Sequence, residues 1–153
     1  MNNTYYTYSM PRKAYTTLPA DYTVCLHEDC PMAATCLHHI AFSALQESET
    51  YLHLINPSMC TKSEGCRFYR DSKPVMYACG FTGFQQKMFP QQYQSFMKIM
   101  IGELGRNAYF AYRRGELPLS PKLQETILAA LKSVGITEAL PFDRYEEQIN
   151  YYD

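Results

Sequence analysis

The sequence predicts an α+β protein in which a cysteine-rich amino-terminal lobe, with one helix and a small sheet, packs on a helical carboxy-terminal lobe. Two observations support this fold class. Five of the six cysteines lie between residues 25 and 66, among short apolar runs separated by turn residues. After residue 89 the apolar residues repeat at helical spacing instead. We divide the chain into an irregular lead-in over 1–20, a cysteine-rich lobe over 21–89 and a helical lobe over 90–153, and expect the two lobes to form one compact domain.

The elements of the amino-terminal half are predicted from turn and cap signals. Pro31 suits the first turn of a helix over 31–46, because the N–H that proline lacks is unpaired there in any residue. An apolar stripe at helical spacing follows it. The run 51–55 alternates and ends at an Asn-Pro turn, which is typical of a short strand. The apolar run 75–79, closed by Gly80, predicts a second strand.

The carboxy-terminal half is predicted to be helical. Its helices are expected over residues 90–104, 106–113, 121–134 and 142–145. Ser120 provides the cap for the third of these helices, because its hydroxyl can accept a hydrogen bond from an unpaired N–H of the first turn. Gly115 and Gly135 are expected to end the second and third helices, since glycine adopts the left-handed conformation without strain. Asp143 is expected to cap the last one.

Composition excludes several classes of function. The 153 residues carry a net charge of −1, so no overall attraction to nucleic acid or to an anionic membrane is expected. The amino terminus lacks the basic start and apolar run of a secretory signal, and no stretch approaches the roughly 20 apolar residues of a membrane span. We therefore expect a cytoplasmic protein without membrane contact. In a reducing cytosol, unevenly spaced cysteines are more often metal ligands or buried thiols than disulfides.

The cysteine segment predicts a metal site. Zinc prefers four ligands in a tetrahedron, and deprotonated sulfur is among its favoured donors. The four predicted ligands are Cys25, Cys30, Cys36 and Cys66. Cys60 and His39 are reserve ligands, while Cys79 lies in an apolar strand and is predicted to be core. The spacing departs from the close CxxC pairs of common zinc modules, so an iron–sulfur cluster and buried thiols without metal stay open as alternatives.

Six short segments carry a resemblance to a known family. They are DYTVC over 21–25, CPMAATCL over 30–37, NP at 56–57, CRFYR over 66–70, AYRRGE over 111–116 and LSP over 119–121. Together they resemble an uncharacterised family of small cysteine-containing proteins from anaerobic gut bacteria. Its motif matches Cys25, Cys30, Cys36 and Cys66, so the resemblance favours these four over Cys60 and Cys79. The family implies no activity, and an anaerobic host slightly favours an iron–sulfur cluster.

These observations indicate a non-catalytic, metal-stabilised binding or regulatory module with an unknown protein partner. The sequence contains no glycine-rich phosphate loop, nucleophile elbow or HExxH motif, so no catalytic residue is predicted. Two alternatives stay open: an iron–sulfur or thiol redox sensor, and a nucleic-acid-binding protein that uses arginine and aromatic side chains. The predicted contact residues for a partner or a nucleic acid are Arg67, Tyr69, Arg70, Arg113 and Arg114.

Overall fold

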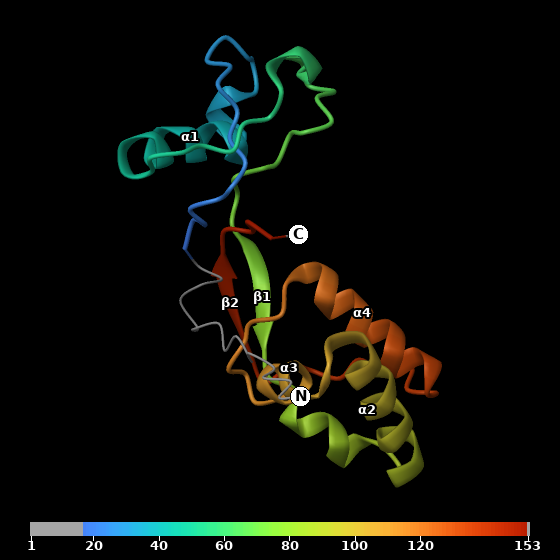
Figure 1. The fold of residues 1–153 in the computed structure, drawn as a ribbon. Helices are drawn as coiled ribbons and strands as arrows, with labels where there is room; N and C mark the ends of the chain where they lie inside the picture. The colour runs from blue at the N-terminus through green and yellow to red at the C-terminus, as the bar shows by residue number, and fades with distance from the viewer. Residues whose placement is uncertain (1–16, 153) are drawn as a thin grey trace, which may run out of the picture.

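The structure, a computed structural model, describes residues 17–152, so most of the predicted lead-in over 1–20 lies outside the described residues. The described chain folds into helices and one two-stranded antiparallel sheet, which confirms the α+β prediction (Figure 1). The helices and strands are α1 (Leu37–Ser48), β1 (Val75–Cys79), α2 (Pro90–Leu104), α3 (Arg106–Arg113), α4 (Pro121–Ser133) and β2 (Arg144–Gln148). Short 3-10 turns cover Ala33–Thr35, Pro57–Met59 and Thr82–Lys87.

The sheet joins segments that are far apart in the sequence. β1 pairs antiparallel with β2, with Val75 opposite Gln148 and Cys79 opposite Arg144. The opposite edge of β1 is bridged by Leu119, which exchanges two backbone hydrogen bonds with Ala78, at 2.7 and 3.1 Å. The predicted strand over 75–79 is therefore confirmed, and both of its edges are paired.

The predicted helix over 142–145 is wrong, because this segment leads into β2. The N–H of Asp143 donates to the carbonyl of Gly80 at 2.9 Å. The Asp143 carboxylate accepts hydrogen bonds from the backbone N–H and the hydroxyl of Thr82, at 3.0 and 2.9 Å. Asp143 therefore fixes the start of the turn at Thr82–Lys87 and does not cap a helix. No helix forms here because the backbone groups of the residues after Asp143 pair with the distant β1.

The amino-terminal helix begins six residues later than predicted. Residues Ala33–Thr35 form a 3-10 turn, and Cys36 is extended, with φ −85° and ψ 117°. The backbone around Cys36 pairs with a distant segment instead, where the N–H of Leu37 donates to the carbonyl of Arg70 at 2.7 Å. The predicted strand over 51–55 is also wrong, because Leu54 forms only an isolated parallel bridge, to Val24.

The three long carboxy-terminal helices begin and end close to where the sequence predicts. Proline opens α2 and α4, and the hydroxyl of Ser120 accepts a hydrogen bond from the N–H of Leu123 at 3.3 Å. After α3 and α4 the chain turns at Gly115 and Gly135, whose φ angles are 71° and 87°. No helix of the described chain is long and apolar enough to cross a membrane.

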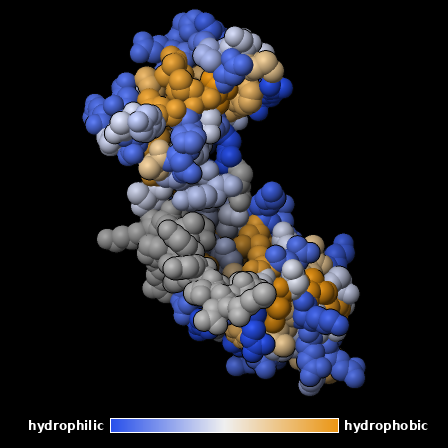
Figure 2. All heavy atoms as spheres, in the orientation of Figure 1, coloured by the Kyte–Doolittle hydropathy of each residue, from blue (hydrophilic) through white to orange (hydrophobic). Residues whose placement is uncertain are grey.

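Two hydrophobic cores lie at opposite ends of the sheet, and Figure 2 shows hydrophobic residues gathered in two separate groups. The carboxy-terminal core is made by residues of β1, α2, α3, α4 and their connections. The amino-terminal core consists of Tyr22, Val24, Leu37, Ala41 and Leu45. The chain end after β2 returns to this second core, where Ile149 and Tyr151 pack against it. Asn150 links this chain end to Arg70 and to β1. Its backbone oxygen accepts a hydrogen bond from Arg70 at 3.0 Å, and its side-chain oxygen accepts one from the hydroxyl of Tyr77 at 3.1 Å.

Candidate functional site

Five cysteines line one pocket beside the amino-terminal core. Two come from the loop over residues 25–30, one lies just before α1, and two come from the loop over residues 60–66. They are Cys25, Cys30, Cys36, Cys60 and Cys66, and we call their site the thiol pocket. All five are half-buried, free thiols. The space inside the pocket is about 20 Å³, which is room for one water-sized ion and not for an organic molecule. Cys79 lies elsewhere, buried in β1 with 1% exposure, which confirms that it is a core residue.

Backbone hydrogen bonds of Cys25 and of the residue before it hold this cysteine in place. Its own N–H donates to the carbonyl of His38 in α1 at 3.0 Å. The preceding residue, the fully buried Val24, donates its N–H to His53 at 2.8 Å and accepts from Ile55 at 2.9 Å. The first cysteine of the pocket is thereby fixed between α1 and the 53–55 segment.

Cys30 and Cys66 each lie in a pair of successive tight turns. The N–H of Cys30 donates to His27 at 3.4 Å, and its carbonyl accepts from Ala33 at 3.0 Å. In the same way, the N–H of Cys66 donates to Ser63 and its carbonyl accepts from Tyr69, both at 3.0 Å. Repeated turns of this kind place a side chain at the tip of a loop, where it is accessible to a ligand.

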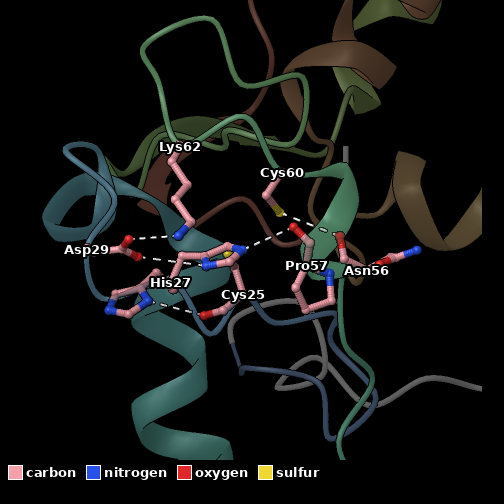
Figure 3. Close-up of polar contacts among 8 residues, drawn as sticks. Cys25, His27, Asp29, Asn56, Pro57, Cys60 and Lys62 are labelled. Carbon is pink, nitrogen blue, oxygen red and sulfur yellow. Dashed lines mark hydrogen bonds and ion pairs between the residues drawn. The ribbon is translucent and has the colours of Figure 1, made fainter.

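Three side-chain contacts tie the loop of Cys25 and Cys30 to its surroundings (Figure 3). The Nε2 atom of His27 lies 3.3 Å from the carbonyl oxygen of Pro57, just ahead of Cys60. The carboxylate of Asp29 forms an ion pair with Nζ of Lys62 at 2.7 Å, and this hydrogen bond is the main reason that the pKa of Asp29 is lowered. The Nδ1 atom of His39 lies 3.1 Å from the carbonyl oxygen of Cys25. The two cysteine-bearing loops are therefore held face to face.

The thiol of Cys60 shares its surroundings with three other cysteines. The pKa of Cys60 is raised to about 11, mainly by burial and then by the neighbouring thiols of Cys25, Cys66 and Cys30. Four thiols this close together oppose one another's ionisation, and a bound cation is what would relieve that repulsion. The charge of Cys36 acts on Tyr22 instead, whose pKa is raised mainly by burial.

The thiols are gathered but not arranged around a central point. Within residues 17–152, no three histidine, cysteine, aspartate or glutamate side chains stand in a group that could hold a metal ion as oriented here. The structure thus brings all four predicted ligands and the reserve ligand Cys60 to one pocket, without a ligand sphere. Their side chains would have to turn inward to bind an ion.

The histidines around the pocket differ in what they offer. A carbonyl only accepts hydrogen bonds, so the Nδ1 atom of His39 carries the proton and its Nε2 atom keeps a free lone pair. His39 lines the thiol pocket, so this reserve ligand offers a nitrogen donor there. His38 stacks on Tyr22 instead, and its Nδ1 atom lies 2.5 Å from the carbonyl oxygen of Thr23. Burial lowers the pKa of His38.

The residues predicted to contact a partner or a nucleic acid each make a contact within the chain. Arg67 lies over the ring of Phe68 at 4.6 Å, and the hydroxyl of Tyr69 donates to Thr35. Arg70 donates to Asn150 as described, while Arg113 donates to Gln85 and Arg114 forms an ion pair with Glu116. Of these residues Tyr69 lines the thiol pocket, whereas Arg113 and Arg114 lie at the end of α3. Nucleic-acid binding stays a prediction.

The family of the chain can now be stated. The model of DUF6078, a family of unknown function, matches residues 3–151. The chain belongs to this family. No curated protein and no solved structure matches it. The predicted resemblance to a family without an established activity is confirmed, and the function of this DUF6078 protein has to be inferred from the thiol pocket.

Proposed function

We propose that the thiol pocket binds one thiophilic metal ion, zinc, through four thiolates, and that the protein is a metal-stabilised binding or regulatory module for a protein partner. The observation that carries this proposal is the convergence of five cysteines from three chain segments on one small pocket. Thiolate sulfur is a preferred donor for zinc, and the space of about 20 Å³ suits a single ion.

The ligands that we propose are Cys25, Cys30, Cys60 and Cys66. All four line the thiol pocket, and Cys25, Cys30 and Cys66 lie near enough to Cys60 to contribute to the rise of its pKa. The set predicted from the sequence has Cys36 in place of Cys60 and is the direct alternative. The two sets make opposite predictions for variants at these two positions, as described below.

A bound metal would add stability to the small amino-terminal core. Among residues 17–152 that core has five buried hydrophobic residues, and the described segments around it are joined by isolated bridges rather than by strands. Small cores of this kind are commonly reinforced by a metal or by disulfides. Because the thiols have to turn inward, binding would draw the loops of Cys25 and Cys60 together, and the binding free energy would be coupled to folding.

A site of four thiolates also supports a role without catalysis. Catalytic zinc keeps one coordination position open for water or substrate, whereas four protein ligands fill the tetrahedron. The contacts between loops, His27 with Pro57 and Asp29 with Lys62, would then present a rigid surface around the ion. We place recognition of the partner on this surface of loops.

The first test is the metal content of tag-free protein purified without oxygen or chelators. Elemental analysis should give about one zinc per chain, and the solution should be colourless, because zinc has no visible transitions. Iron with acid-labile sulfide and a broad visible band would replace this proposal with the redox alternative. A metal-free protein that is fully folded would overturn the metal site altogether.

The second test compares three cysteine variants by the same analysis. We expect Cys60→Ser to lose zinc and Cys36→Ser to keep it, since serine is a poor zinc ligand. The opposite result would assign the fourth position to Cys36. Cys79→Ser is the matched control: it places a hydroxyl in the other core and should lower stability by about 1–3 kcal/mol while the zinc content stays unchanged.

A further inference from the structure

Two cysteines of the thiol pocket, Cys25 and Cys60, lie on facing loops and line the same small space. The Sγ atom of Cys60 lies 3.9 Å from the backbone oxygen of Asn56. The residue before Asn56, Ile55, donates its N–H at 2.9 Å to Val24, the residue before Cys25. Figure 3 shows the side chains of Cys25 and Cys60 on facing segments of the chain. Both thiols are free and half-buried.

The rest of the fold holds the two loops in this position independently of the thiols. Two backbone hydrogen bonds join Val24 to the 53–55 segment. Further along the two loops, His27 contacts Pro57 and Asp29 forms an ion pair with Lys62. We therefore expect that a disulfide between Cys25 and Cys60 needs rotation of the two side chains and little movement of the backbone, because a disulfide forms only between cysteines whose backbones are already close.

We propose that Cys25 and Cys60 form a reversible disulfide when the protein meets hydrogen peroxide, and that this bond switches the site off. One sulfur–sulfur bond forms and the oxygen–oxygen bond of the peroxide breaks. The sulfurs are oxidised, the peroxide oxygens are reduced, and two molecules of water leave with the two thiol protons, or with two protons from solvent where metal-bound thiolates react. Thiol–disulfide exchange with a small thiol restores the pair.

The consequence for the metal rests on the proposed function. A disulfide sulfur is a poor ligand, because the thiolate is the form that binds zinc. Oxidation of Cys25 and Cys60 removes two of the four proposed ligands and leaves Cys30 and Cys66, which are too few to retain the ion. The thiol pocket would then release zinc on oxidation and bind it again on reduction.

The test maps the disulfide in the full chain after treatment with hydrogen peroxide. Free thiols are blocked, and the unreduced protein is cut after glutamate. Cuts after Glu28, Glu47, Glu49 and Glu64 separate the partners, since Cys25 lies in peptide 1–28, Cys60 in 50–64, Cys30 and Cys36 in 29–47, and Cys66 in 65–103. We expect the main linked species to join peptides 1–28 and 50–64. This link should persist in Cys36→Ser and vanish in Cys60→Ser.

Zinc release is measured in parallel with a chromophoric chelator, and about one zinc per chain should appear as the link forms. A main link from 1–28 to 29–47, or from 50–64 to 65–103, would overturn the pair, and so would the absence of any link. Chelator-treated protein is oxidised in the same way. If the untreated protein contains no zinc but the 1–28 to 50–64 link still forms, the proposed function fails while the disulfide pair stands.

Discussion

The two cores of the protein obtain their stability in different ways. The carboxy-terminal core contains twelve buried hydrophobic residues, and four aromatic rings at its centre are at most 1% exposed. These rings are those of Phe81, Phe84, Phe96 and Tyr109, and Phe81 meets Phe96 and Tyr109 edge to face. Burial of large rings in such contacts is a strong source of stability. We therefore expect this half of the molecule to fold without a ligand.

In the described part of the chain, the amino-terminal core has five buried residues and borders the thiol pocket. Its long regular element there is α1, and Cys25 and Cys60 lie in loops. The two halves therefore have different roles. The large carboxy-terminal core stabilises the sheet, and the small amino-terminal core, which packs against the chain end after β2, carries the cysteines. The following predictions separate these two sources of stability.

Removal of metal should have the largest effect, and it should be confined to the amino-terminal core. A structural zinc site contributes on the order of 10 kcal/mol, so a chelator should destabilise α1 by several kcal/mol. In hydrogen exchange, amides of α1 should exchange about 100-fold faster or more, while those of α2 and α4 keep their protection. Equal loss of protection in α1 and α2 would contradict the division, and zinc added back in excess should restore the original pattern.

Truncation of a ring in the carboxy-terminal core should have the next largest effect. Phe96 is fully buried in α2, and Phe96→Ala should lower the free energy of unfolding by about 3–5 kcal/mol, because it removes apolar contacts and leaves a cavity. Urea unfolding measures this change. The zinc content of the folded variant should stay at the wild-type value, since Phe96 is absent from the lining of the thiol pocket. Loss of zinc would show that the two cores are not separable.

The parts of the fold that the sequence predicts are those with local causes. Pro90, Pro121 and Ser120 start helices through their own backbone and side-chain chemistry, and the structure places α2 and α4 accordingly. β2 and the late start of α1 were missed because pairing with distant segments decides them. β2 forms against β1, and Cys36 is held extended by its bridge to Asp71. Neither partner can be read from the neighbouring residues.

The same distinction applies to the candidate site. Clustering of cysteines in the sequence predicts that they share a site, and five of them do line one pocket. The placement of Cys60 on the loop that faces Cys25 depends on docking of the 53–55 segment against Val24, which is a tertiary event. One local signal was present, the Asn-Pro turn before Cys60, where the side chain of Asn56 accepts a hydrogen bond from Ser58 at 3.0 Å. It predicts a tight turn but not which loop the turn faces.

The smallest of these effects is a loss of folding stability at alkaline pH, caused by Tyr109 in the carboxy-terminal core. Burial raises the pKa of Tyr109, the hydrogen bond with Tyr93 raises it further, and Arg113 opposes the shift. In the unfolded chain this tyrosine loses its proton near its ordinary value of 10.0, whereas the folded state keeps the proton. The unfolded state therefore binds fewer protons above pH 10, and stability should fall there by at most about 1.4 kcal/mol per pH unit for this group.

Tyr109→Phe removes that titration, so its free energy of unfolding should fall less steeply above pH 10 than that of the wild type. At neutral pH the variant should lose about 1 kcal/mol, because the hydroxyl contact with Tyr93 at 3.2 Å is gone. Tyr22→Phe is the matched change in the amino-terminal core. Its buried hydroxyl has no hydrogen-bond partner among residues 17–152, so its removal should cost nothing at neutral pH. Urea unfolding at neutral and alkaline pH compares the two, and equal losses at neutral pH would mean that the two hydroxyls have equivalent surroundings.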